Sequence, residues 1–187
     1  EGVYIAAVDA NKKPIPETEE YIECDTLLLS VGLIPENELS KKAEIKLSQI
    51  TGGPVVNQYM QTAEAAVFAC GNVVHVNDLV DNVTVESITA GKYAAQYALG
   101  SMPVAVRRVE VTPGSNIRYL CPQAIDISDQ DETVKLYFRV VCPDRDVKIT
   151  ASSGGTAIAK KRAMVVNPGE MEIIPIDTGK IAGEDIT

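Results

Sequence analysis

Ala65–Asn72 reads Ala-Ala-Val-Phe-Ala-Cys-Gly-Asn, and a second segment with helical periodicity follows it from about Val83 to Leu99. The six apolar residues end abruptly at Gly71, which predicts a buried strand that stops in a turn. In the second segment, small and apolar residues recur at the spacing of one helix face: Val85, Ile88, Gly91, Ala94, Ala95 and Ala98. We therefore expect a strand, a glycine turn and a helix that packs closely on its neighbour.

This predicted unit is a natural seat for an anionic group. The first amide groups of a helix have no partner within the helix, and they point toward whatever lies in front of it. Ligands of open α/β sheets bind at such carboxyl ends of strands. The alternative is an ordinary strand–loop–helix packing unit without a ligand, and the spacing alone does not distinguish the two.

The residue types favour the first interpretation, because two motifs resemble those of a known family. Thr62, the run Val67–Asn72 and the pair Ala90-Gly91 resemble the second FAD motif of the pyridine nucleotide–disulfide oxidoreductase family. Upstream, Asp25–Asn37 reads Asp-Thr-Leu-Leu-Leu-Ser-Val-Gly-Leu-Ile-Pro-Glu-Asn and is similar to the strand that leads from that family's NAD domain into its FAD domain. The motifs stand in the family's order, and together they cover residues 1 to about 100.

The resemblance implies five cofactor-binding residues. Gly71 would bring the backbone close to the FAD, and Asn72 would contact a ribityl or pyrophosphate oxygen. The family usually has Asp at the second position; Asn keeps an acceptor oxygen and adds two donor hydrogens. Thr84, Val85 and Glu86 match the helix start whose amides and dipole face the flavin in that family. Plain helix capping is the alternative for these three, since an acid in a first turn is favourable by itself. No catalytic residue and no metal ligand is predicted.

The predicted fold class is an α+β fragment. It consists of the returning half of a two-dinucleotide-binding (FAD/NAD(P)) α/β domain, followed by a small all-β, Ig-like sandwich. Residues 1–33 would end an NAD(P)-binding domain with a β-hairpin and a central strand at 26–31. Residues 34–102 would form the C-terminal half of the FAD-binding domain, with a short helix within 36–47. Residues 103–187 would be the β-sandwich, with strands at 104–111, 117–120, 133–142, 146–151, 156–160 and 170–176 and a frayed tail at 178–187.

Charge and length exclude several classes of protein. The net charge is −9, and residues 1–102 carry 6 Lys, no Arg and 14 acids, a balance of −8. This balance argues against nucleic acid as a partner, because duplex binding needs clustered cations. No apolar run approaches the roughly 20 residues of a membrane span, and no signal-peptide pattern is seen. We expect a cytoplasmic protein without a membrane span.

Four cysteines, at 24, 70, 121 and 142, form no Cys-x-x-Cys pair, so neither a zinc site nor a dithiol redox centre is indicated. Cys121 and Cys142 each precede a proline, and the sequence leaves their redox state open. His75 is the single histidine and lies three residues after Asn72. A structural loop histidine is its more common interpretation, and we assign it no catalytic role.

The sequence contains no Gly-x-Gly, the core of the family's phosphate-binding loops. The preferred hypothesis is therefore a C-terminal fragment of an FAD-dependent, NAD(P)-linked oxidoreductase, in which hydride passes between nicotinamide and flavin. The fragment would carry only the second half of the FAD site, with FAD and NAD(P) bound by a longer parent, and would be inactive alone. The alternative is a non-catalytic binding or oligomerisation module, built on the C-terminal β-region and used for homodimer or subunit contact. The substrate is not predicted.

Overall fold

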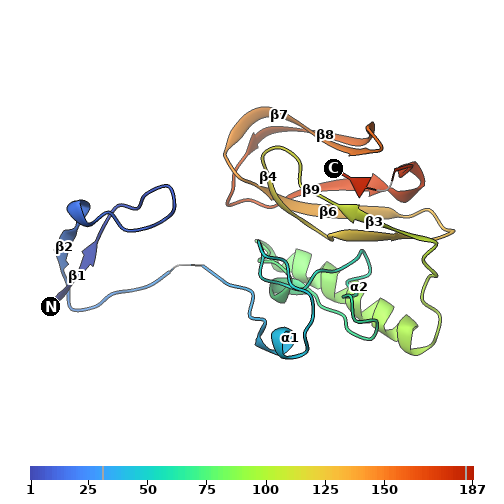
Figure 1. The fold of residues 1–187 in the computed structure, drawn as a ribbon, viewed down its shortest axis with the longest axis horizontal. Coiled ribbons are helices and arrows are strands. Elements are labelled where there is room, and N and C mark those ends of the chain that lie inside the picture. The colour runs from blue at the N-terminus through green and yellow to red at the C-terminus, as the bar shows by residue number, and fades with distance from the viewer. Residues whose placement is uncertain (31, 184) are drawn as a thin grey trace. The chain divides into compact units, whose positions relative to one another are not determined.

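The computed structural model of the chain describes residues 1–30, 32–183 and 185–187. The chain divides into two compact units, Glu1–Leu33 and Ile34–Thr187 (Figure 1). The further division of the second unit at residues 102–103 stays a prediction. In the described residues, no helix is both long enough and apolar enough to cross a membrane.

The first unit is a β-hairpin followed by an irregular segment. β1 (Gly2–Ile5) pairs antiparallel with β2 (Glu20–Glu23), with a 3₁₀ turn, η1 (Pro16–Thr18), between them. The rings of Tyr4 and Tyr21 lie next to each other across the pair, with centroids 5.1 Å apart and planes tilted by 53°.

The central strand expected at 26–31 is not formed over Thr26–Ser30, and Val31 lies outside the described residues. Leu28 is 88% exposed, and Leu27 and Leu29 are exposed as well. An apolar run of this kind becomes a strand only when neighbouring strands pair with its backbone and cover its faces. The part of the chain that the structure describes offers this run no such neighbour.

The second unit begins with loops and two helices. α1 (Glu38–Lys42) is shorter than the helix expected within 36–47. The strand predicted at 65–70 is also wrong, because this segment is a loop with a single β-bridge, between Gln61 and Phe68. A 3₁₀ turn, η2 (Gly71–Val73), follows it, and then the long helix α2 (Val80–Ala98).

α2 does not bury its small residues as expected. It turns Glu86 and Ala90 inward, whereas Gly91 is exposed and a Cβ added there would meet no atom within 4 Å. Val80 and Ile88 on the helix are exposed too. The close-packed face that we predicted around Gly91 is therefore wrong in this chain.

The rest of the unit is almost entirely strand. A five-stranded sheet has the order β5-β3-β10-β7-β8, and a three-stranded sheet has the order β4-β6-β9. All pairs are antiparallel except β10 with β3. The bounds are β3 (Arg107–Val111), β4 (Ile117–Cys121), β5 (Ala124–Ile127), β6 (Thr133–Val140), β7 (Asp144–Ser153), β8 (Thr156–Val166), β9 (Glu172–Asp177) and β10 (Asp185–Ile186). A mostly-sheet fold with few helices matches the predicted class, but the Ig-like arrangement is not confirmed.

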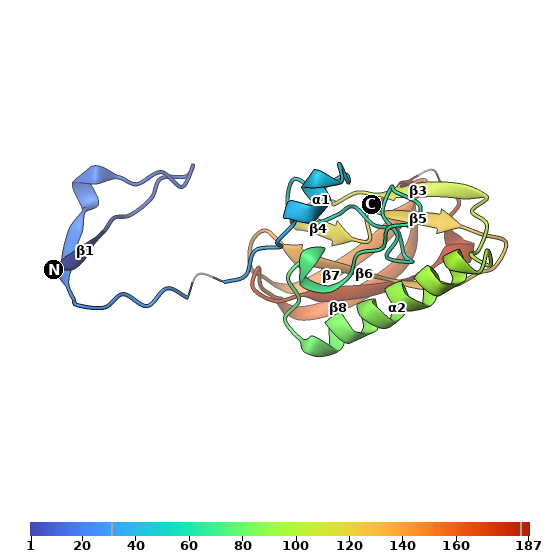
Figure 2. The ribbon, with the colours of Figure 1, turned by 90° about the horizontal axis from the view of Figure 1, so that it is seen from below.

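Two hydrophobic clusters lie on opposite faces of the three-stranded sheet. On one face, Leu136 and Phe138 of β6 pack with residues of the five-stranded sheet, among them Val109 and Ile186. On the other face, Tyr137 and Cys121 pack with Ala90 of α2 and with the loops before it. Figure 2 shows α2 running along the strands of this region. Both faces of β6 are thus buried, and the three-stranded sheet separates two cores.

The last ten residues are not the frayed tail that we predicted. They form a 3₁₀ turn, η3 (Thr178–Lys180), and the short strand β10. Ile181 is 6% and Ile186 is 1% exposed. Arg107 holds this segment by donating to the carbonyls of Ile181 and Gly183. Buried apolar side chains and a parallel pairing with β3 therefore anchor the end of the second unit.

Candidate functional site

Gly71 forms a tight turn directly in front of α2. Its φ is +72°, and a Cβ added there would meet Cγ1 of Val83 at 3.1 Å. Side chains rarely tolerate this backbone conformation. The Gly71 amide donates to Oε2 of Glu86 at 2.7 Å. The turn is thus fixed to the helix that follows it by a glycine, which the geometry requires, and by one carboxylate.

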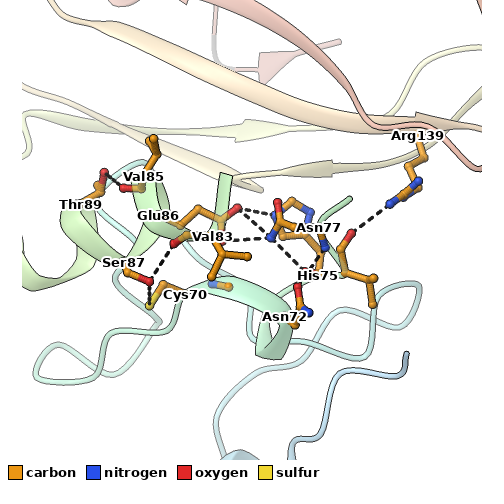
Figure 3. A network of polar contacts seen from close by, with 12 residues as sticks. Cys70, Asn72, His75, Asn77, Val83, Val85, Glu86, Ser87, Thr89 and Arg139 are labelled. Atoms are coloured by element: carbon orange, nitrogen blue, oxygen red, sulfur yellow. Dashed lines mark hydrogen bonds and ion pairs between the residues drawn. The ribbon is translucent and has the colours of Figure 1, made fainter. Parts of the chain in front are cut away.

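Glu86 is the centre of a buried polar network (Figure 3). Its Oε1 lies 2.8 Å from Nε2 of His75, and the exposed fractions of the two residues are 3% and 1%. Asn77 donates more weakly to both carboxylate oxygens, at 3.4 and 3.5 Å. The His75 ring stands edge-on to the rings of Tyr119 and Tyr137. Because a buried carboxylate is costly unless it is bonded, these contacts make Glu86 a structural centre of the turn.

Asn72 lies on the outer side of the same turn. It is exposed, and its Oδ1 accepts from the backbone amide of Asn77 at 3.0 Å. The side-chain nitrogen of Asn72, Nδ2, donates to no acceptor among the described residues. Its two hydrogens are therefore available to an oxygen-bearing ligand. The side chain is therefore oriented by one bond and free to donate at its other end.

The two motifs that carry the family resemblance meet at this turn. Asn37, the last residue of the upstream motif, is 3% exposed. Its amide donates to the carbonyl of Val73 at 2.8 Å and to that of Gly52 at 3.0 Å. Asn37 thus connects the segment after the upstream apolar run to the Gly71 turn.

The start of α2 lies earlier than the sequence indicated. The helix begins at Val80, so Thr84, Val85 and Glu86 belong to its second turn. A helix leaves the first amides at its start without an intrahelical partner; here these include the amides of Val80 and Asp81, whereas the Asn82 amide donates to the carbonyl of Leu79 at 3.1 Å. The Thr84 hydroxyl donates to the carbonyl of Val80, and Val85 is 44% exposed. The structure thus brings Gly71 and Glu86 together, places Asn72 on the same turn, and directs Thr84 and Val85 away from it.

A cavity of about 310 Å³ lies beside this network, between α2 and the three-stranded sheet. Val85, Glu86 and Thr89 of the helix line one wall, and Cys121 and Tyr137 line another. Burial, and then the charge of Glu86, raises the pKa of the Cys121 thiol well above its usual value. The same causes raise the pKa of Tyr137. Both groups therefore stay protonated near neutrality, and neither provides a nucleophile.

Arg139 of β6 ties the loop after the turn to the β-region. It donates to the carbonyl of Val76 at 3.1 Å and pairs with the Asp78 carboxylate. The other oxygen of Asp78 accepts from the Met171 amide at 2.6 Å. The loop that orients Asn72 is in this way held from the sheet side as well.

Sequence reasoning missed Asn37, Asn77 and Arg139 and left His75 without a role. The available signal was the density of polar side chains between Gly71 and α2, which is unusual for a segment whose residues become buried. The partners of Arg139 are distant in sequence, and no local pattern indicates them. All four cysteines are free thiols, and the described residues contain no cluster that could hold a metal ion.

Comparison with known proteins decides the family. Residues 2–107, more than half of the chain, match the family model described as pyridine nucleotide-disulphide oxidoreductase. The chain belongs to this family. It is 31% identical over 64 residues to the "Nitric oxide reductase FlRd-NAD(+) reductase" of Escherichia coli O127:H6 (strain E2348/69 / EPEC), an alignment that covers 34% of this chain and 16% of that relative. No solved structure matches the chain. The family match contains the Gly71 turn, all of α2 and the upstream motif.

Proposed function

We propose that this chain supplies the second half of the FAD site of an NAD(P)-linked oxidoreductase. Membership of the family supports flavin and nicotinamide cofactors in general. The observation that carries the assignment to this chain is the Gly71 turn, which is fixed to α2 through Glu86 and presents Asn72 to solvent. When bound, the flavin would exchange hydride with the nicotinamide, and this chain's residues would bind and orient it.

The side chains at the turn fit such a group. A ribityl or phosphate oxygen needs donors, and Asn72 has two hydrogens without a protein acceptor in the described part of the chain. Gly71 permits close approach of the backbone because it carries no side chain, and the free amides at the start of α2 favour negative charge. Glu86 would act indirectly, by holding the turn.

For the same chain on its own we expect no activity. A few hydrogen bonds at one turn oppose the full cost of immobilising a large ligand. The sequence has no Gly-x-Gly loop to hold the pyrophosphate from the other side. We therefore expect the isolated chain to bind FAD weakly and to transfer no hydride.

The experiment is a titration of the isotopically labelled chain with FAD, followed by amide NMR. We expect chemical-shift changes that are confined to residues 71–73 and 80–83. Titration with riboflavin and with ADP, as fragments of FAD, separates the contacts of the flavin end from those of the adenosine end. Asn72→Leu should weaken the response, and Asn72→Asp, which lacks the two donor hydrogens, should weaken it as well. An unchanged turn at saturating FAD would contradict the assignment. A stoichiometric yellow protein that oxidises NAD(P)H after gel filtration would contradict the half-site.

A further inference from the structure

Two residues of the β-region, Arg139 and Met171, hold the loop between the Gly71 turn and α2. Arg139 is in β6 and Met171 directly precedes β9, whereas the family match ends at residue 107. Both bond to residues 76–78 of this loop. The Gly71 turn is therefore supported by a part of the chain that the family model does not cover.

The guanidinium of Arg139 bonds to the loop on either side of Asn77. It donates to the carbonyl of Val76 at 3.1 Å and pairs with the Asp78 carboxylate. Its other terminal nitrogen donates to the carbonyl of Gly169, between β8 and β9. Figure 3 shows the Arg139 side chain pointing from the sheet toward the loop that contains Asn77. Because the side chain is 12% exposed and its donors form a rigid plane, it restricts the orientation of the groups that it contacts.

Asp78 is held from two directions. One carboxylate oxygen faces Arg139, and the other accepts from the Met171 amide at 2.6 Å. A carboxylate between two donors of the β-region has little freedom to move. Three residues earlier in the loop, the buried ring of His75 stands edge-on to the ring of Tyr137 in β6. The loop is thus anchored to the β-region near both of its ends.

Asn77, which lies between the two anchored positions, orients Asn72. Its backbone amide donates to Oδ1 of Asn72 at 3.0 Å. An exposed asparagine side chain otherwise samples several rotamers and turns its amide group over a broad range. Because Oδ1 and Nδ2 belong to one planar group, the bond to Oδ1 also sets the direction of the two Nδ2 hydrogens. A displacement of the loop would therefore misdirect these donors.

We propose that Arg139 is a positioning residue of the cofactor half-site, which directs the donor hydrogens of Asn72 toward the cofactor by holding residues 76–78. This inference rests on the proposed function, because it takes Asn72 as a cofactor contact. Arg139 acts through Asn72 and does not itself contact the ligand, since its bonds go to the protein. The β-region thus has a part in ligand binding that a surface for subunit contact alone would not require.

The test is a double-mutant cycle on the whole chain, with FAD as the probe. Arg139→Met keeps an unbranched apolar stem but removes all the donors. We expect it to raise the dissociation constant for FAD, measured from the amide shifts of residues 71–73, about three- to tenfold. In the Asn72→Leu background the same substitution should cause no further loss, because the effects of two residues that act through one contact do not add.

Arg107→Met is the matched control. Arg107 also donates to two backbone carbonyls within the β-region, those of Ile181 and Gly183, but it makes no bond to the loop before α2. Its replacement removes a guanidinium of the same kind and should leave the dissociation constant for FAD unchanged. The comparison separates the position of the loop from the stability of the β-region.

A second measurement needs no ligand. Relaxation of the Asn72 side-chain nitrogen in the free protein reports how firmly this group is oriented. Arg139→Met should increase the mobility of the group, and Arg107→Met should not. Asp78→Asn keeps an oxygen for the Met171 amide but removes the charge that faces Arg139, and it should act in the same direction as Arg139→Met. This milder variant tests the proposal even if Arg139→Met does not fold.

Three results would overturn the proposal. Equal losses of FAD affinity in Arg139→Met and Arg107→Met would mean that both act only through the stability of the β-region. Additive effects of Arg139→Met and Asn72→Leu would mean that Arg139 attracts the anionic cofactor directly. An unchanged Asn72 side chain in the free Arg139→Met and Asp78→Asn proteins would exclude positioning. If FAD does not bind to the unaltered chain, the proposed function fails, and the measurement on the free protein still decides whether Arg139 orients Asn72.

Discussion

The two motifs of the family behave differently in this chain. The Gly71 turn is closed and buried, with Glu86, His75 and Asn77 bonded to one another. The leucine run at 26–30 is irregular and exposed. The difference lies in where the partners are. The Gly71 amide finds its acceptor, Glu86, 15 residues later in the chain, and Asn37 and Arg139 add bonds to the turn and to the loop after it, whereas a central strand needs neighbours that the described residues do not supply. The hydrogen bonds of the Gly71 turn thus form in this chain, whereas the leucine run is not paired into a sheet.

The largest loss of stability at the Gly71 turn is expected from Glu86→Ala. The substitution leaves the Gly71 amide and the buried His75 without their acceptor, which should lower the free energy of unfolding by about 2–4 kcal/mol. Urea unfolding of the variant measures the change. Thr84→Ala on the same helix is the control and should change stability by no more than about 0.5 kcal/mol. Equal effects of the two substitutions would mean that the network does not hold the turn.

Gly71→Ala and Gly91→Ala should act in opposite directions. The first places a side chain at φ +72°, in contact with Val83, and should cost about 1–2 kcal/mol. The second replaces an exposed glycine inside α2 and should stabilise the protein by about 0.5–1 kcal/mol. Thermal unfolding compares the pair. Destabilisation by Gly91→Ala would indicate that this helix face is covered in solution.

Much of the fold could be predicted from local pattern, and the two strand predictions that failed share one cause. The strands of the β-region were recognised because they carry their own alternation, such as Val134, Leu136 and Phe138 in β6. The runs at 26–31 and 65–70 have the composition of buried strands, but the structure shows no strand over 26–30 or 65–70, since the described residues supply no sheet neighbours for them. Of the site, Gly71 and Asn72 were identified by motif. Asn37 and Arg139 act through partners distant in sequence, and the burial of Glu86 depends on how α2 packs.

The pH dependence of stability should distinguish the buried Cys121 thiol from the exposed Cys142 thiol. Burial, and then Glu86, raises the pKa of Cys121, so the folded state keeps the proton that the unfolded state loses. The resulting stability is fully present below the unfolded pKa of roughly 8.5 and declines above it, by about 1 kcal/mol up to pH 9.5. Unfolding curves from pH 7 to 9.5 should show this decline. Cys121→Ala should reduce it, and Cys142→Ala, at an exposed position, should not.

The smallest effect on stability is expected at the leucine run itself. Leu28 is 88% exposed, so Leu28→Asp removes no packing and should change the free energy of unfolding by less than about 0.5 kcal/mol. Its effect should appear in association instead, because an exposed apolar run is prone to pair with another chain. Light scattering across a concentration series should show less self-association for Leu28→Asp than for the unaltered chain. Leu99→Asp, at a similarly exposed position directly after α2, provides the comparison. If Leu28→Asp instead destabilises the chain by several kcal/mol, the run is buried in solution, and the contrast between the two motifs fails.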